Sequence, residues 1–142
     1  MSQRPRFLIA DDMEVNRGLM LHFVKAYGDC EFAVNGKEVV EHFLAAKAEG
    51  RPLDLILLDI MMPEMDGQEA LTQIRTLEAQ AGLSLKEEVK VVMVTAMGDW
   101  DNALAGFKKG AVEYLVKPIQ ANRVAKVMES MGFTKDETPP NP

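Results

Sequence analysis

Five short apolar runs divide the chain, and each is followed by a longer segment whose apolar residues recur at intervals of three or four. A short continuous apolar run is typical of a strand buried on both faces, whereas the wider spacing is typical of an amphipathic helix. The runs predict strands at 7–10, 31–34, 55–58, 89–94 and 112–116. The wider spacing predicts helices near 15–26, 39–44, 70–77, 100–107 and 124–131.

Strands and helices therefore alternate throughout, which indicates a parallel sheet with helices on both faces. Turn-forming residues separate the units, as at Asn35-Gly36, and Gly110 and Gly132 follow two of the predicted helices. Right-handed crossovers leave few arrangements of five strands, of which the flavodoxin-like order 2-1-3-4-5 is common. The predicted fold class is α/β, a doubly wound five-stranded parallel sheet in that order.

The length of 142 residues suits one domain that buries its own core. We expect this domain to span residues 1–132. The segment 133–142 is polar and rich in proline, so it is expected to be a disordered C-terminal tail.

Charge and cysteine content narrow the range of partners and compartments. The net charge of -6 and the pI near 4.9 argue against nucleic acid as a partner, because phosphate backbones are bound by clustered Lys and Arg. The single cysteine, Cys30, can form no internal disulfide and fits a reducing compartment. No apolar stretch approaches the ~20 residues of a membrane span, and the chain begins with no signal-peptide pattern. We therefore expect a cytoplasmic protein without membrane contact.

Polar residues stand at the ends of four predicted strands. Asp11 and Asp12 end the first strand, Asp59 the third, Thr95 the fourth and Lys117 the fifth. The carboxyl ends of parallel strands share one edge of the sheet, and ligands bind at that edge. These five side chains are therefore expected to converge on one small site.

Each of these residues also has an ordinary structural interpretation. Asp59 alone could be a turn or helix-capping aspartate, and we expect at least one of Asp11 and Asp12 to cap the following helix as well. Lys117 alone would be a surface lysine, and Thr95 a β-branched strand residue. It is their combination at one edge that favours a functional site.

Three carboxylates at one edge of the sheet favour a bound cation. Two like charges ~4 Å apart repel by about 4 kcal/mol at an effective dielectric constant of ~20, so a bare cluster is costly or partly protonated. Oxygen ligands favour a hard ion, and Mg²⁺ takes one or two carboxylates while binding phosphate oxygens at other positions. The pattern therefore predicts Mg²⁺-dependent phosphoryl transfer, in which Asp59 is the nucleophile and forms an acyl phosphate.

Four motifs at these strand ends resemble those of the receiver domain of two-component response regulators. They are FLIADD at 7–12, LLDIMMPEMDG at 57–67, VTA at 94–96 and YLVKP at 114–118, and the resemblance covers about residues 5–132. Four motifs in order are far more specific than any one of them. Because no output domain follows in this sequence, the expectation is a single-domain, stand-alone receiver that signals through protein contacts.

The resemblance implies roles at the acidic positions. Asp59 would accept a phosphoryl group from a histidine kinase or a histidine phosphotransfer protein. Asp11, Asp12 and Asp59 would hold Mg²⁺, directly or through water, together with the backbone carbonyl of Met61. The Met61 side chain is apolar and could shield the acyl phosphate from water, so slow autodephosphorylation is a further hypothesis.

The resemblance also implies how the phosphorylated state is detected. Lys117 would pair with the phosphoryl oxygens, and the bond between Lys117 and Pro118 is usually cis in this family. Thr95 would move its hydroxyl group to the phosphate, and Tyr114 would move inward with it. From its pattern alone, Tyr114 is equally well explained as a half-buried packing residue.

The family's output surface comprises the fourth helix, fifth strand and fifth helix, here with Trp100, Phe107, Tyr114, Arg123 and Lys126. From their helical spacing alone, Trp100 and Phe107 would face the core. A downstream protein target is expected, with the receiver as a monomer or a phosphorylation-dependent dimer. Its catalysis would be limited to its own phosphorylation and dephosphorylation.

Three other classes of function remain open from the residues. A Mg²⁺-dependent phosphatase that forms an aspartyl phosphate usually needs a second carboxylate two residues after the nucleophile, where this chain has Met61. A flavodoxin-like cofactor binder needs a phosphate loop after the first strand, where Asp11 and Asp12 would repel phosphate in the absence of metal. A degenerate receiver that binds constitutively is disfavoured, because every acidic and switch position is filled.

Overall fold

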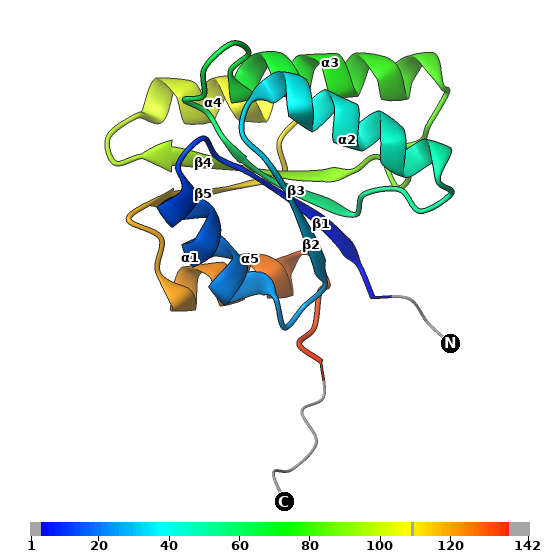
Figure 1. The fold of residues 1–142 in the computed structure, drawn as a ribbon. Helices are drawn as coiled ribbons and strands as arrows, with labels where there is room; N and C mark the ends of the chain where they lie inside the picture. The colour runs from blue at the N-terminus through cyan, green and yellow to red at the C-terminus, as the bar shows by residue number, and fades with distance from the viewer. Residues whose placement is uncertain (1–3, 109, 137–142) are drawn as a thin grey trace, which may run out of the picture.

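The computed structural model describes residues 4–108 and 110–136, in which strands and helices alternate as predicted (Figure 1). The strands are β1 (Arg6–Ala10), β2 (Asp29–Ala33), β3 (Leu55–Asp59), β4 (Lys90–Ala96) and β5 (Glu113–Lys117). The helices are α1 (Glu14–Val24), α2 (Gly36–Ala48), α3 (Gly67–Gln80), α4 (Trp100–Lys108) and α5 (Ala121–Ser130). Within the described residues, no helix has the length and apolar character that crossing a bilayer requires.

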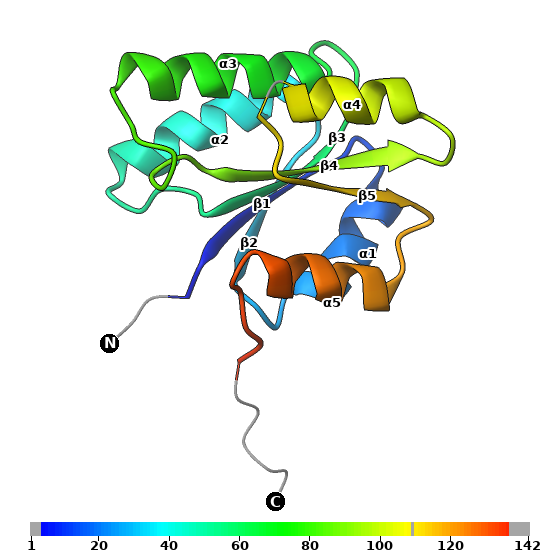
Figure 2. The same cartoon turned by 180° about the vertical axis from the view of Figure 1, so that it is seen from behind.

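The five strands form one parallel sheet in the order β2-β1-β3-β4-β5, which confirms the predicted fold class. Helices α1 and α5 cover one face, and α2, α3 and α4 cover the other (Figures 1 and 2). The register pairs Asp59 with Val94 and Ala96 with Lys117. The carboxyl ends of β3, β4 and β5 therefore lie at the same edge of the sheet.

Side chains along each strand alternate between two cores, one on each face of the sheet. In β1, Leu8 belongs to the core beneath α2 and α3, which includes Phe43. The next residue, Ile9, belongs to the core beneath α1 and α5, which includes Met20 and Met128. Because both faces are buried, the strands read as continuous apolar runs rather than as alternating patterns.

The chain turns sharply between β3 and α3, close to the carboxyl edge of the sheet. Asp66 caps α3 by accepting a hydrogen bond from the backbone N–H of Glu69 at 2.9 Å. The backbone N–H of Gly67 donates to the carbonyl of Ile60, also at 2.9 Å. Helix α3 therefore starts directly against the end of β3.

The first four residues of the predicted tail, 133–136, pack against the domain. Phe133 lies edge-on to Phe7 with ring centroids 5.1 Å apart, and Asp136 pairs with Arg4 at 2.6 Å. Because the tail is otherwise polar, its composition did not predict that Phe133 packs against the domain. The remainder of the predicted tail, residues 137–142, lies outside the described residues.

Candidate functional site

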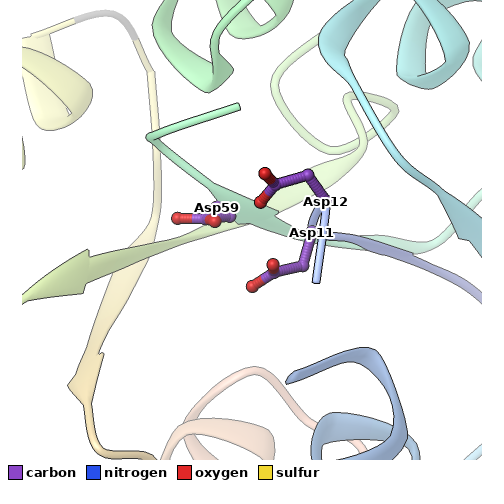
Figure 3. Close-up of side chains that lie close together, drawn as sticks. All are labelled: Asp11, Asp12 and Asp59. Carbon is purple, nitrogen blue, oxygen red and sulfur yellow. The ribbon is translucent and has the colours of Figure 1, made fainter. Parts of the chain in front are cut away.

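Three aspartates meet at the carboxyl edge of the sheet (Figure 3). Asp59 is the last residue of β3, and Asp11 and Asp12 directly follow β1. One carboxylate oxygen from each residue lies within 4.8 Å of those of the other two. Figure 3 shows the three side chains grouped at this edge, with those of Asp11 and Asp12 on either side of Asp59. Asp11 and Asp59 are buried, whereas Asp12 is exposed.

Asp11 is fixed by several neighbours. Its Oδ1 accepts hydrogen bonds from the Met13 backbone N–H at 2.9 Å and from Asn16 Nδ2 at 3.4 Å, and its own N–H donates to the Ala33 carbonyl at 3.1 Å. The N-cap of α1 is Met13, and no side chain caps this helix. The expectation that Asp11 or Asp12 would cap α1 was therefore wrong. The bend after β1 places both aspartates before the N-cap, where the Asp11 carboxylate faces the site.

Lys117 joins the two buried carboxylates. Its Nζ lies 3.3 Å from Asp11 Oδ2 and 3.3 Å from Asp59 Oδ2. Desolvation lowers the pKa of Lys117, but the charges of Asp59 and Asp11 outweigh it and raise the pKa above its ordinary value. The ammonium group is therefore charged at neutral pH. The peptide bond from Lys117 to Pro118 is cis, the isomer that the resemblance implied.

The environment of Asp59 disfavours its ionised form. The residue is 4% exposed. Its Oδ1 accepts a hydrogen bond from the Met61 N–H and its Oδ2 accepts one from Lys117, each at 3.3 Å. Burial, and then the charge of Asp11, raise the pKa of Asp59 to about 6 against the opposing effects of Lys117 and Met61. A further cation beside Asp59 would therefore stabilise its ionised form.

The oxygen donors of the cluster fit a hard divalent cation. Asp11 Oδ2 is buried and accepts no hydrogen bond from the described residues, although Lys117 lies within ion-pair distance. A buried carboxylate oxygen whose one partner among those residues is an ion pair, and which lies beside two other carboxylates, is in an environment that a further cation stabilises. Asp11, Asp12 and Asp59 could hold Mg²⁺, which binds few carboxylates and keeps some of its waters. The exposed Asp12 leaves the site open to those waters.

The two predicted switch residues, Thr95 and Tyr114, lie on the neighbouring strands β4 and β5 and differ in burial. Thr95 is buried and follows Val94, which pairs with Asp59 across β3 and β4. Its hydroxyl group makes a long 3.5 Å hydrogen bond to the carbonyl of the next residue. Tyr114 of β5 is half-buried and packs against the core beneath α2 and α3. Met61 is 70% exposed.

A groove of about 560 Å³ runs beside the site, between β5 and α5. The residues of the predicted output surface or the acidic site that line it are Tyr114, Lys117, Arg123 and Lys126. The side chains of Trp100 and Phe107, which also belong to that predicted surface, lie outside the described part of the structure. The groove therefore connects the acidic site with three of the five predicted surface residues.

Two residues of α1 support the site and were not predicted from the sequence. Asn16 donates to the Asp11 carboxylate, and Arg17 Nη1 donates to the Asp11 backbone carbonyl at 2.9 Å. Their closeness to the aspartates along the chain was the available signal. Polar residues at the start of a helix most often face solvent, so the pattern alone did not distinguish them.

Comparisons with known proteins identify the family to which this chain is similar. A family model described as the response regulator receiver domain matches residues 7–129. The chain is 38% identical over 129 residues to the chemotaxis protein CheY of Listeria monocytogenes, covering 87% of this chain and 95% of that protein. It is 35% identical over 126 residues to CheY of Bacillus subtilis, covering 87% and 93%.

A solved structure agrees with these relatives. It is a co-crystal structure of the Saccharomyces cerevisiae histidine phosphotransfer signaling protein Ypd1 and the receiver domain of its downstream response regulator Ssk1. The matching chain is 27% identical with a TM-score of 0.78, and the match covers 93% of this chain and 91% of that one. The present chain therefore belongs to the response regulator receiver domain family of two-component systems.

Proposed function

We propose that this chain is a phosphorylation-activated signalling switch and that Asp59 accepts the phosphoryl group. The observation that carries the proposal is the buried Asp59 carboxylate, 3.3 Å from Lys117 Nζ and within 4.8 Å of the carboxylates of Asp11 and Asp12. A carboxylate nucleophile, a fixed cation and a pair of metal-binding carboxylates are the groups that this type of phosphoryl transfer uses. Membership of the family supports the same assignment.

In the proposed reaction, an oxygen of Asp59 attacks the phosphorus atom of a phosphohistidine in line with the bond to the imidazole nitrogen. The P–N bond breaks as the O–P bond forms, and the donor ring, protonated on its other nitrogen, leaves as neutral imidazole with the electrons of the broken bond. Asp59 must be ionised to attack, and Lys117 favours its ionised form. The same ammonium group would then neutralise charge on the transferred oxygens.

Asp11, Asp12, Asp59 and the carbonyl of Met61 are proposed to hold Mg²⁺, which when bound supplies positive charge to the phosphoryl oxygens. Among the described residues, Lys117 is the one ammonium group paired with this cluster of three carboxylates, and it contacts Asp11 and Asp59. Asp11 Oδ2 accepts no hydrogen bond from the described residues and is paired with Lys117 alone, which supports a role for a second cation.

Thr95 and Tyr114 are proposed to detect the acyl phosphate. A phosphoryl group brings a charge of about −2 and several acceptor oxygens. Thr95 now makes a long hydrogen bond, so donation to the phosphate would be the better interaction. Tyr114 lines the groove with Arg123 and Lys126, so its inward movement would alter that surface. The surface formed by α4, β5 and α5 is therefore the proposed output face.

The proposed phosphodonor is a histidine kinase or a histidine phosphotransfer protein, and the proposed target is a second protein. The likeness to the Ssk1 receiver domain, crystallised together with Ypd1, supports a donor of this type. We further propose that the protein is cytoplasmic and that it is a monomer or a phosphorylation-dependent dimer.

The proposal is tested by incubating the protein with Mg²⁺ and phosphoramidate or acetyl phosphate and measuring its intact mass. We expect one added phosphoryl group in the wild-type protein and none in Asp59→Asn. Asp66→Asn is the matched control, because Asn also caps helices and Asp66 caps α3 outside the cluster. Absence of an adduct in the wild-type protein would defeat the proposal, and multiple turnover of phosphate esters would indicate a phosphatase instead.

A further inference from the structure

Asp12 differs from its two neighbours in how it is held. Asp11 is buried and accepts hydrogen bonds from Met13 and Asn16, and Asp59 is buried and contacts Lys117. Asp12 is exposed, and its carboxylate has no hydrogen bond or ion pair within the described part of the chain. The space that its carboxylate can reach is therefore set by the backbone that carries it rather than by contacts of the side chain.

That backbone is held by Arg17. The Arg17 guanidinium donates from Nη1 to the Asp11 carbonyl at 2.9 Å, and this carbonyl belongs to the peptide group that joins Asp11 to Asp12. A hydrogen bond from a charged donor is stronger than one between neutral groups. Arg17 belongs to α1 and is partly buried.

We propose that Arg17 is a positioning residue for cation binding: through the Asp11 carbonyl it fixes the orientation of Asp12 relative to Asp11 and Asp59. The inference rests on the proposed function in assuming that these carboxylates bind Mg²⁺. It goes beyond that function because Arg17 is a cationic residue outside the set of proposed Mg²⁺ ligands, and its removal is nevertheless expected to change the Mg²⁺ affinity. Groups that orient metal ligands typically change metal affinity by about 10–100-fold when removed.

The direction in which the Mg²⁺ affinity changes when Arg17 is removed distinguishes a positioning role from a simple effect of its charge. If Arg17 acted only as a positive charge near the site, its removal would strengthen Mg²⁺ binding, because like charges repel. If Arg17 positions Asp12, its removal weakens Mg²⁺ binding even though a repulsive charge has been removed. A purely structural role would lower the stability of the fold and leave the Mg²⁺ affinity of the folded protein unchanged.

The experiment is calorimetric titration of the unphosphorylated full chain with MgCl₂, with thermal unfolding in EDTA as the measure of stability. We expect Arg17→Met to weaken Mg²⁺ binding by about tenfold or more. Arg17→Lys should retain part of the affinity, because Lys can still donate one hydrogen bond. Lys37→Met removes an exposed positive charge on α2 and should match the wild-type protein.

A double-mutant cycle with Asp12→Asn tests the route of the effect. If Arg17 acts through Asp12, Arg17→Met should change the affinity much less in the Asp12→Asn background than in the wild-type background. Unchanged or tighter binding by Arg17→Met, or equal effects in the two backgrounds, would overturn the inference. If Arg17→Met does not fold, the same cycle with Arg17→Lys decides. Failure of the wild-type protein to bind Mg²⁺ would overturn the proposed function and this inference together.

Discussion

Gly67 and Asp59 are packed backbone against backbone, and a β-carbon on Gly67 would overlap the carbonyl oxygen of Asp59. Gly67 is the first residue of α3, and its N–H donates to the carbonyl of Ile60 at 2.9 Å. The start of α3 is thus fixed against the residue proposed to be phosphorylated. Only a residue without a side chain allows this approach, because the opposing atom is backbone and cannot move aside cheaply.

Gly67→Ala should therefore destabilise the protein by about 1–3 kcal/mol or more and slow phosphorylation of Asp59 by small phosphodonors. Urea unfolding and intact-mass time courses measure the two effects. Gly18→Ala is the matched control: it lies within α1, a β-carbon there has no neighbour within 4 Å, and the change should stabilise the helix by roughly 0.5–1 kcal/mol. Equal stability of the two variants would contradict the role of the close approach.

The raised pKa of Asp59 predicts a pH-dependent gain in stability for Asp59→Asn. A pKa of about 6 in the folded protein, against an ordinary 3.8, means that the fold disfavours the ionised carboxylate. The cost is fully present above the folded pKa and disappears as the pH falls toward the unfolded value. In EDTA, Asp59→Asn should raise the free energy of unfolding by about 1–3 kcal/mol at pH 7, and this gain should vanish near pH 4.

Urea unfolding of both proteins between pH 4 and pH 8 measures this gain. Saturating Mg²⁺ should reduce it, because a bound cation stabilises the ionised carboxylate in the wild-type protein. A gain that does not depend on pH would show that the Asp59 charge is not the source.

Lys117→Gln should change Mg²⁺ affinity and the rate of phosphorylation in opposite directions. Lys117 Nζ lies 3.3 Å from oxygens of both Asp11 and Asp59, so it competes with a metal for their charge. Its removal should tighten Mg²⁺ binding while slowing phosphorylation at saturating Mg²⁺, because a cation for the transferred oxygens is lost. Calorimetry and intact-mass time courses measure the two effects, and Lys86→Gln, at an exposed loop position, should change neither. Weaker Mg²⁺ binding by Lys117→Gln would refute this assignment.

Met61→Asn should accelerate hydrolysis of the acyl phosphate. Met61 lies two residues after Asp59 and is 70% exposed, so an amide at this position could orient an attacking water. A tenfold faster loss of phosphate would correspond to a barrier lower by about 1.4 kcal/mol. Leu85→Asn makes a comparable exchange at an 86% exposed loop position before β4 and should leave the rate unchanged. An unchanged rate in Met61→Asn would remove the shielding hypothesis.

The acidic site could be predicted because its residues occupy positions set by topology. Strand ends are recognisable from apolar runs, and parallel strands bring Asp11, Asp59 and Lys117 to one edge whatever their separation in sequence. The support from Arg17 could not be predicted in this way, because it depends on the rotamer of a long side chain reaching one carbonyl. The same holds for the approach of Gly67 to Asp59, which depends on the path of a turn.

The burial of Glu78 also could not be predicted from the sequence. This residue continues the apolar stripe of α3 at a position four residues after Ile74, but as a glutamate it is expected at the surface. It is fully buried because its carboxylate is satisfied on both sides. Glu78 Oε1 accepts from Arg75 Nη1 at 2.6 Å, and Oε2 accepts from the Val89 N–H at 2.7 Å.

Hydrogen bonds of Arg75 and Glu78 link α3 to the segments that precede β5 and β4. Arg75 Nη2 donates to the Gly110 carbonyl at 2.7 Å, just before β5, while Glu78 receives the N–H that precedes β4. Arg75→Met should destabilise the protein by about 3–5 kcal/mol, because it leaves the buried Glu78 charge without a counterion. Adding Glu78→Gln should recover part of that loss, since Gln is neutral and can still accept from Val89. Urea unfolding of the two single variants and the double variant measures the coupling, and strictly additive losses would show that the pair contributes no buried charge interaction.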